Sequence, residues 1–298
     1  MPDLRTPDER FADLPGFPFA AHYIEDLAAA GGARIHYVDE GPASAGTVWL
    51  CLHGEPTWSY LYRKMIPVFV DAGHRVVAPD LPGFGRSDKP DDDALYTFDF
   101  HRDVLREFIE RLDLTGIRLV CQDWGGLLGL TLPMSMPDRF AGLLVMNTML
   151  GTGDVPLSEG FLGWRDFVAS QPDLQVSALM KRAVPGLGDT EAAAYDAPFP
   201  DITYKAGVRR FPQMVPEHRD DPGAELSRQA RQWWQSEWRG RSLMAIGMQD
   251  PVLGPPVMQQ LHACIKGCPP PVEVADAGHF VQERGEEIAT RAVVELTA

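Results

Sequence analysis

The stretch Cys121-Gln122-Asp123-Trp124-Gly125-Gly126 decides the fold of this chain. The apolar run at 117–120 precedes it with the composition of a strand, and residues 127–132 follow with the composition of a helix. Two glycines directly after Asp123 allow a sharp turn and a close approach of helix to strand. The pattern predicts a nucleophile elbow, a strand–turn–helix unit in which one side chain stands above a parallel sheet. Here that side chain is an aspartate.

Segments of strand length recur on both sides of this turn and alternate with helical segments. Residues 21–27 and 34–38 alternate around a Gly-Gly turn, which predicts a hairpin. A helix period extends from about Phe98 to Leu112. Such alternation predicts an α/β fold with a mostly parallel eight-stranded sheet flanked by helices. The further expected strands, mostly near-continuous apolar runs, are 47–52, 74–79, 141–146, 242–247 and 272–274.

The strand rhythm is interrupted between residues 148 and 218. This stretch has frequent prolines and glycines, scattered aromatic residues and short helical segments. An insertion after the sixth strand predicts a helical cap over the carboxyl ends of the strands, where open α/β sheets bind their ligands. We therefore predict a core domain of residues 1–147 and 219–298 and a cap (lid) domain of residues 148–218.

The composition is that of a globular protein with an acidic surface. Of the 298 residues, 45% are hydrophobic and 23% are charged, which is enough for a sizeable core. The net charge of −15 argues against nucleic acid and anionic membranes as partners, because both attract basic patches. The N-terminal stretch lacks the pattern of a signal peptide, and the sequence contains no apolar run of about 18 residues. We therefore expect a cytoplasmic protein.

The cysteines give no sign of a metal site. Cys51 and Cys121 fall in expected strands, where cysteine usually acts as a small hydrophobic residue. Cys264 and Cys268 are close in sequence, but no histidine–cysteine cluster accompanies them. We expect reduced cysteines, no metal and no cofactor.

Two further residues at strand ends complete a set with Asp123. Asp250 follows the strand that leads into Gly247-Met248-Gln249, and His279 lies in the loop after the last strand. Taken alone, such an aspartate is most often a turn or cap residue, and such a histidine is a surface or core residue. The three together occur in the order nucleophile, acid, histidine, which is the order of the α/β-hydrolase fold.

An aspartate at the elbow predicts a different reaction from a serine. Aspartate side chains have a reference pKa of about 3.9 and are ionised at neutral pH without a base. The carboxylate can displace a good leaving group from a saturated carbon, forming an ester on Asp123. His279, oriented by Asp250, then deprotonates the water that hydrolyses the ester. The oxyanion of that step needs donors, for which the backbone N–H groups of Glu55 and Trp124 are candidates.

Several motifs resemble those of haloalkane dehalogenases. In the core they are His53-Gly54-Glu55-Pro56, Asp80-Leu81-Pro82-Gly83-Phe84-Gly85-Arg86-Ser87-Asp88, Gln122-Asp123-Trp124-Gly125-Gly126, Ala245-Ile246-Gly247-Met248-Gln249-Asp250 and Asp276-Ala277-Gly278-His279-Phe280. In the cap they are Phe161-Leu162-Gly163-Trp164, Ala197-Pro198-Phe199-Pro200-Asp201 and Phe211-Pro212-Gln213-Met214-Val215. The resemblance spans about residues 15 to 295. It matches best the subfamily whose acid follows the cap and whose halide-binding pair is two tryptophans.

The resemblance implies an α/β-hydrolase that converts short haloalkanes to a primary alcohol, a halide ion and a proton. It makes Asp123 the nucleophile, His279 the base and Asp250 the acid that orients the base. It also makes the indole N–H groups of Trp124 and Trp164 the halide-binding pair. This fits the chemistry of indole, which offers a donor and no acceptor to an anion.

The same resemblance implies a small apolar pocket. It also implies that the only ligands are a haloalkane substrate and a halide product. The side chain of Glu55 would hold the hydrolytic water while its amide serves the oxyanion hole. The position of Trp164 in the sequence, taken alone, fits a packing residue of the cap as well as it fits a halide-binding residue. We expect a monomer that binds neither nucleic acid nor membranes. The implied pocket wall consists of Leu127, Phe161, Phe211, Pro212, Val215, Val252 and Leu253.

Three other functions compete with this one. Epoxide hydrolases share the aspartate nucleophile, but they protonate the epoxide with two cap tyrosines, for which Tyr195 and Tyr204 are candidates. A fluoroacetate-type dehalogenase needs arginines in its pocket, and the candidates are Arg182, Arg209 and Arg210. A non-catalytic binder on the hydrolase fold is the third alternative, although the intact Asp–His–Asp set argues against it.

Overall fold

The computed structural model describes residues 4–297; residues 1–3, part of the N-terminal stretch inspected for a signal peptide, and residue 298 lie outside this range. Within it, eight strands form one sheet in the order β1-β2-β4-β3-β5-β6-β7-β8. They are β1 (His22–Ile24), β2 (Ile35–Glu40), β3 (Val48–Leu52), β4 (Arg75–Pro79), β5 (Ile117–Gln122), β6 (Phe140–Met146), β7 (Arg241–Gly247) and β8 (Val272–Val274). β2 is antiparallel to both β1 and β4, and all other pairs are parallel. The predicted sheet is confirmed.

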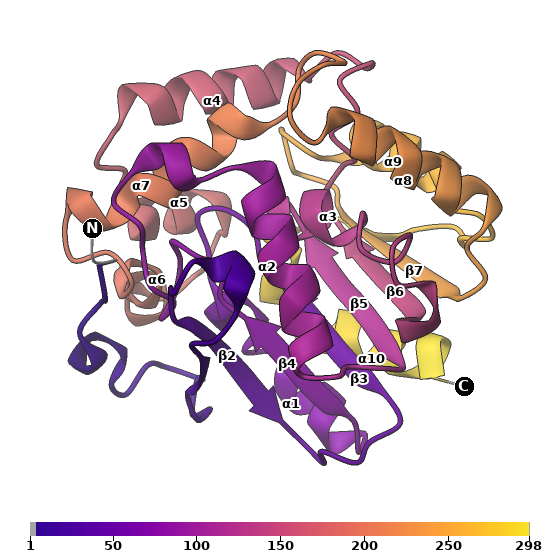
Figure 1. Cartoon of the computed structure of the whole chain (residues 1–298), viewed down its shortest axis with the longest axis horizontal. Coiled ribbons are helices and arrows are strands. Elements are labelled where there is room, and N and C mark those ends of the chain that lie inside the picture. The colour runs from indigo at the N-terminus through magenta and orange to yellow at the C-terminus, as the bar shows by residue number, and fades with distance from the viewer. Residues whose placement is uncertain (1–3, 298) are drawn as a thin grey trace.

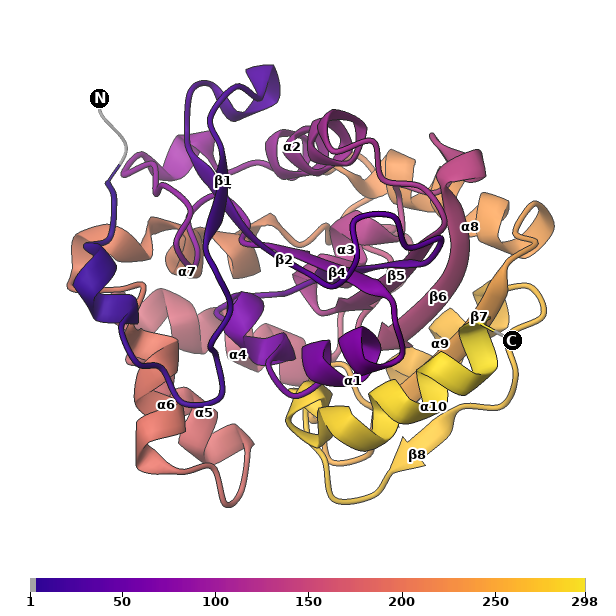
Figure 2. The ribbon, with the colours of Figure 1, turned by 90° about the horizontal axis from the view of Figure 1, so that it is seen from below.

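Helices cover both faces of this sheet. They are α1 (Ile66–Asp71), α2 (Phe98–Arg111), α3 (Trp124–Gly129), α4 (Glu159–Ser170), α5 (Val176–Ala183), α6 (Asp189–Asp196), α7 (Ala206–Arg210), α8 (Ala224–Ser236), α9 (Pro255–Cys264) and α10 (Gly285–Thr297). Figure 2 shows α1 and α10 on one face of the sheet and α2 on the other. The central strands are therefore buried on both sides, which explains their continuous apolar sequences.

The predicted helix after residue 97 is present as α2. Thr97 caps it, since its side chain accepts a hydrogen bond from the backbone N–H of Phe100. The buried side chains recur with the helical period, so one face of α2 packs on the core. The hairpin of β1 and β2 is also confirmed, but β1 ends at Ile24, short of the predicted strand, because a 3₁₀ turn follows at Ala28–Ala30.

Helices α4 to α7 fall within residues 148–218 and gather at one end of the strands (Figure 1). Ser158 caps α4 by accepting a hydrogen bond from the N–H of Phe161 at 3.1 Å. The Ser158 hydroxyl also donates to the carbonyl oxygen of Val252 at 3.0 Å. This pair of bonds joins the start of α4 to the loop after β7. The exact domain boundaries stay a prediction.

A buried ion cluster joins the cap to the core. The Arg63 guanidinium donates to both carboxylate oxygens of Glu283, at 2.8 and 2.9 Å. From α6, the Tyr195 hydroxyl donates to Glu283 at 2.6 Å, and Glu191 accepts from Arg63 at 2.8 Å. The side chains of Arg63 and Glu283 are only 2% and 4% exposed. Glu191 and Tyr195 of α6 thus bind a nearly buried Arg63–Glu283 ion pair of the core.

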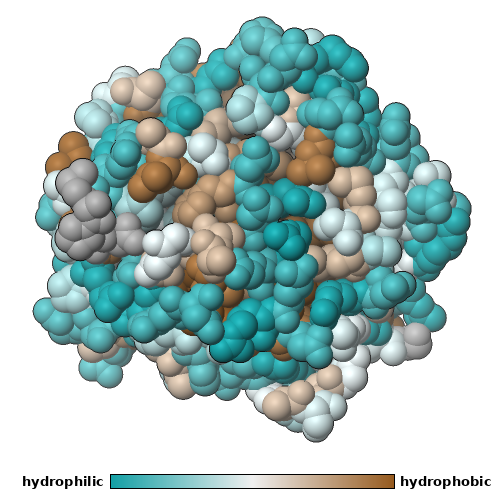
Figure 3. Space-filling model, in the orientation of Figure 1, coloured by the Kyte–Doolittle hydropathy of each residue, from teal (hydrophilic) through white to brown (hydrophobic). Residues whose placement is uncertain are grey.

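One face of the molecule is mostly polar. Figure 3 shows a mostly hydrophilic face on which hydrophobic residues are scattered in small patches. In the range 4–297, no helix is long and apolar enough to cross a membrane. The same residues contain no group of three His, Cys, Asp or Glu side chains placed to hold a metal ion.

Candidate active site

Asp123 stands at the tip of the turn between β5 and α3. Its φ of 51° and ψ of −128° are unusual for a residue with a Cβ and persist only when the surroundings hold them. The Asp123 N–H donates to the carbonyl oxygen of Asn147 at 3.0 Å. The Thr148 hydroxyl donates to the carbonyl oxygen of Asp123 at 2.7 Å. The end of β6 therefore fixes the turn, and the structure has the elbow that the sequence predicted.

Gly125→Ala is expected to destabilise the protein. A Cβ at this position would overlap with the backbone carbonyl oxygen of Leu52, which cannot rotate away. We expect a loss of about 1–3 kcal/mol in the free energy of unfolding, measured as a lower thermal midpoint. Gly163→Ala in α4 is the control, because nothing lies within 4 Å of its added Cβ. Equal midpoints for the two variants would contradict the close packing at the elbow.

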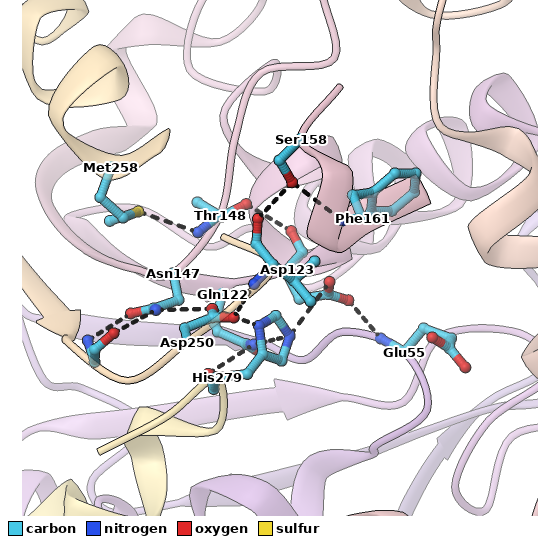
Figure 4. Close-up of polar contacts among 12 residues, drawn as sticks. Glu55, Gln122, Asp123, Asn147, Thr148, Ser158, Phe161, Asp250, Met258 and His279 are labelled. Atoms are coloured by element: carbon cyan, nitrogen blue, oxygen red, sulfur yellow. Dashed lines mark hydrogen bonds and ion pairs between the residues drawn. The ribbon is translucent and has the colours of Figure 1, made fainter. Parts of the chain in front are cut away.

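The three predicted strand-end residues meet in one place (Figure 4). Nδ1 of His279 lies 2.8 Å from Oδ2 of Asp250, and Nε2 of His279 lies 3.5 Å from Oδ2 of Asp123. The Asp250 side chain is fully buried, whereas the His279 and Asp123 side chains are 15% and 16% exposed. The imidazole thus stands between a buried carboxylate and one that a small molecule can reach.

Asp250 is held in its charged form. Burial favours the neutral acid, but the charge of His279 and several hydrogen bonds outweigh burial and lower the pKa of Asp250. Asn147 donates to its Oδ2 at 2.9 Å, and the N–H of Val252 donates to its Oδ1 at 2.8 Å. Asn147 also accepts from the N–H of Gly247 at 2.8 Å, so it clamps β6 to β7. The sequence reasoning missed Asn147, whose only signal is its position directly after β6.

The pKa of His279 is set by two opposing effects. Burial lowers it, but the carboxylates of Asp250 and Asp123 outweigh burial and raise the pKa to about 10. Part of this rise comes from Asp123 itself. A chemical step that removes the Asp123 charge therefore lowers the pKa of His279 and leaves a larger fraction of its imidazole unprotonated.

Glu55 contacts Asp123 through its backbone. Its N–H donates to Oδ1 of Asp123 at 2.8 Å, and a Cβ on the preceding Gly54 would overlap with Asp123. The Glu55 side chain is buried, and its Oε1 has no hydrogen-bond partner among the described residues. Burial and then Asp123 raise the pKa of Glu55 well above its usual range, against the opposing effects of His279 and a hydrogen bond to Trp164. The protonated form of this carboxyl group is therefore favoured.

A cavity of about 420 Å³ lies beside these groups. Its size is in the usual range of ligand pockets. Asp123 and His279 line it together with the predicted residues Phe161, Trp164 and Val252. The predicted nucleophile, the predicted base and one predicted halide-binding tryptophan therefore share one space.

The other predicted wall residues, Leu127, Phe211, Pro212, Val215 and Leu253, are not part of this lining. The Phe211 ring packs against Trp124 with 4.7 Å between centroids, so it supports the elbow from outside. Leu253 lines a neighbouring cavity that shares Phe161 with the first, and Val215 lines a cavity on another side of the cap. Trp124 is buried and is likewise absent from the main lining. The apolar character of these five predicted wall residues reflects packing between the cap and the core.

The residues that support the competing functions are dispersed. The Tyr195 hydroxyl is engaged in the buried ion cluster, and neither Tyr195 nor Tyr204 is among the described residues that line the cavity. Arg182 does line it, from an exposed position near the end of α5. Arg209 pairs with an aspartate on the surface, and Arg210 lines the separate cavity next to the cap.

Gln122, which the sequence reasoning did not select as a site residue, is a neighbour of His279. Its Nε2 lies 2.7 Å from Nε2 of His279 and 3.1 Å from the carbonyl oxygen of the same residue. Its signals in the sequence are its position directly before the elbow and its place in the motif Gln122-Asp123-Trp124-Gly125-Gly126. A glutamine at the end of a buried strand is otherwise unremarkable.

Comparisons with known proteins are consistent with this geometry. A protein family described as having the alpha/beta hydrolase fold matches residues 48–286. The chain is 47% identical to a haloalkane dehalogenase of Psychrobacter cryohalolentis over 295 residues, covering 97% of this chain and 96% of the relative. It is 42% identical to one of Mycolicibacterium paratuberculosis, with 97% and 96% coverage. It also matches the tetrameric structure of haloalkane dehalogenase DpaA from Paraglaciecola agarilytica with a TM-score of 0.97, 53% identity and 100% and 99% coverage.

Proposed function

The chain belongs to the haloalkane dehalogenase family of hydrolases, and from this premise we propose that it cleaves short haloalkanes through an ester on Asp123. The overall reaction converts a haloalkane and water to a primary alcohol, a halide ion and a proton. The observation that carries the proposal is the orientation of the Asp123 carboxylate. Oδ1 accepts the N–H of Glu55, while Oδ2 lies next to His279 in the wall of the cavity.

In the first step, Oδ2 of Asp123 attacks the carbon that carries the halogen. A C–O bond forms, the C–halogen bond breaks, and its electron pair leaves with the halide. The indole N–H groups of Trp124 and Trp164 are the proposed donors to this anion. Trp164 is the better supported of the two, because its side chain lines the cavity. Its indole N–H, which hydrogen-bonds to the Glu55 carboxyl group in this structure, turns to the halide in this step.

In the second step, water attacks the carboxyl carbon of the Asp123 ester and gives one proton to Nε2 of His279. The negative charge develops on Oδ1, at which the N–H of Glu55 already points from 2.8 Å. This distance suits an oxyanion-hole donor. The N–H of Trp124 is the proposed second donor. When this intermediate collapses, the bond between Cγ and Oδ2 of Asp123 breaks, and the alcohol leaves with Oδ2 and the remaining water proton. The carboxylate re-forms with the water oxygen, and His279 returns its proton to solvent.

The first step prepares the base for the second. In the free enzyme the carboxylates of Asp250 and Asp123 raise the pKa of His279. Esterification removes the charge of the Asp123 carboxylate. The pKa of His279 therefore falls when the ester forms, which is when an unprotonated imidazole is required. Asp250 keeps its charge and continues to orient the ring through Nδ1.

Halide release tests this function directly. The purified protein is incubated with 1,2-dibromoethane and a graded set of terminal chloroalkanes and bromoalkanes, and free halide and alcohol are measured. We expect equal amounts of both products. No halide from any of these compounds, with folding verified by circular dichroism, would leave a non-catalytic binder as the better description. Turnover of epoxides in place of haloalkanes would favour the epoxide hydrolase alternative.

Trp164→Phe is expected to lower kcat/KM for a bromoalkane by about 100-fold, the scale seen when one donor to a developing anion is removed. Phenylalanine keeps an aromatic ring in the cavity but lacks the indole N–H. Trp233→Phe is the matched control, because Trp233 packs against Trp234 and Trp238 on α8 and beyond it, outside the cavity lining. A similar small loss in both variants would reduce Trp164 to a packing residue.

The monomeric state and the cytoplasmic location expected from the sequence stay predictions. The relative DpaA is described as tetrameric. Light scattering coupled to size-exclusion chromatography gives the mass of the particle that this chain forms, to be compared with 33.0 kDa for one copy.

A further inference from the structure

The side-chain amide of Gln122 lies directly against the base and is completely buried. Figure 4 shows it beside His279, on the end of β5 that leads into the elbow. One atom, Nε2, makes both contacts with His279, at 2.7 Å to the ring Nε2 and 3.1 Å to the backbone carbonyl oxygen. Gln282 donates to the other end of the amide, Oε1, at 3.4 Å.

The carbonyl oxygen of His279 fixes the orientation of this amide. A carbonyl oxygen accepts hydrogen bonds and never donates them, so the Gln122 atom beside it is the nitrogen. An amide NH₂ group has two hydrogens, and the second is available to the ring Nε2. A nitrogen that accepts a hydrogen bond carries no proton. The contact therefore suits the neutral form of His279, with its proton on Nδ1 facing Asp250, which is the form required once Asp123 carries the ester.

We propose that Gln122 is a positioning residue that holds His279 as a neutral base with Nε2 unprotonated. This rests on the proposed function, because hydrolysis of the Asp123 ester is the step that needs such a base. As the hydrolytic water binds, its O–H replaces the Gln122 N–H as the donor to Nε2. Its proton then passes to Nε2 while its oxygen bonds to the carboxyl carbon of Asp123. Gln122 keeps its bond to the His279 carbonyl oxygen throughout.

The charged groups around His279 favour its protonated form, which is opposite to the effect of Gln122. Asp250 and Asp123 favour the protonated ring, and the charge of Glu55, when ionised, acts in the same direction. After esterification Asp123 is neutral. Asp250 then favours the protonated form of His279, whereas Gln122 favours the neutral form. If Nε2 of His279 were protonated, its N–H would point at the N–H of Gln122, and neither group would have an acceptor. Removal of that donor therefore stabilises the protonated ring and raises the pKa of His279 in the ester intermediate.

The test measures ester hydrolysis as a function of pH. After a pulse of 1,2-dibromoethane, decay of the alkylated protein is followed by intact mass in wild type, Gln122→Met and Gln122→Glu. The rate rises with pH as His279 loses its proton. We expect the midpoint to move up by about 0.5–1 pH unit in Gln122→Met. The shift should be larger in Gln122→Glu, because its carboxylate stabilises the protonated ring.

Gln249→Met is the matched control, since Gln249 lines the cavity but its amide donates to the carbonyl oxygen of Ala275. Its midpoint should equal that of the wild type. A purely structural role of Gln122 would lower the rates of its variants at every pH without moving the midpoint, and this result would overturn the proposal. The initial burst of halide keeps the two proposals separate. No burst in the wild type counts against the proposed function, whereas bursts with unshifted midpoints count only against Gln122.

A second measurement needs no change at Gln122. In uniformly ¹⁵N-labelled Asp123→Asn protein, residue 123 is uncharged, as it is in the ester. A scalar coupling across the hydrogen bond between Nε2 of Gln122 and Nε2 of His279 is expected once the ring is neutral. Its absence there would overturn the proposal even if the Gln122 variants failed to fold.

Discussion

His279→Gln is expected to release about one halide ion per protein molecule and then stop, because general-base catalysis is lost while the nucleophile is intact. Asp123 attacks without help from a base, so its ester still forms. Glutamine has no group that accepts the proton of the hydrolytic water. Steady-state turnover should fall by about 10³–10⁴-fold or more. Intact mass should increase by the alkyl group of the substrate.

The bound alkyl group must be located on Asp123 to support the mechanism. Peptide mapping of His279→Gln after exposure to 1,2-dibromoethane should place the added mass on the peptide that contains the elbow. Wild-type protein treated in the same way should carry little adduct, since its ester turns over. A fully active His279→Gln variant, or an inactive one without any adduct, would count against the two-step scheme.

Asp123→Asn should abolish even the first halide ion, with a loss of about 10⁴-fold or more. The neutral amide is a much weaker nucleophile than the carboxylate. The substitution keeps the shape of the side chain, and asparagine tolerates a positive φ better than most residues, so the φ of 51° is accommodated. Its Oδ1 can still accept the N–H of Glu55.

Thermal unfolding provides the control for this variant. The midpoint of Asp123→Asn should lie close to that of the wild type, because the hydrogen bonds at the turn are made by backbone atoms of residue 123 and by its Oδ1. A burst of halide of wild-type size from a folded Asp123→Asn protein would exclude Asp123 as the nucleophile.

The sheet and the strand-end residues could be predicted because their signals are local. Each buried strand has a short apolar sequence, and Asp123, Asp250 and His279 each follow such a strand. Parallel strands place their carboxyl ends at one edge, so residues far apart in sequence meet there. The structure indeed brings these three side chains within hydrogen-bonding or ion-pair distance.

The pocket wall was harder to predict because it depends on how the cap packs. Phe161 and Val252 line the cavity, whereas Phe211 turns toward Trp124 and fills the space behind the elbow. An apolar residue has the same sequence signal in a wall and in a core. Gln122 and Asn147 were missed for a related reason: a polar side chain at the end of a buried strand reads as an ordinary turn residue until its partner is located.

The ion cluster of Arg63, Glu283 and Tyr195 limits how this enzyme can be re-engineered. Glu283 lies four residues after His279 and accepts from a tyrosine of the cap, so the cap is no interchangeable module. A transplanted cap that lacks Tyr195 and Glu191 would remove one hydrogen bond from Glu283 and one from Arg63, and would leave a buried ion pair with fewer polar partners. Swaps of substrate range between relatives should therefore transfer Tyr195 and Glu191 with the cap, or redesign both sides of the cluster together.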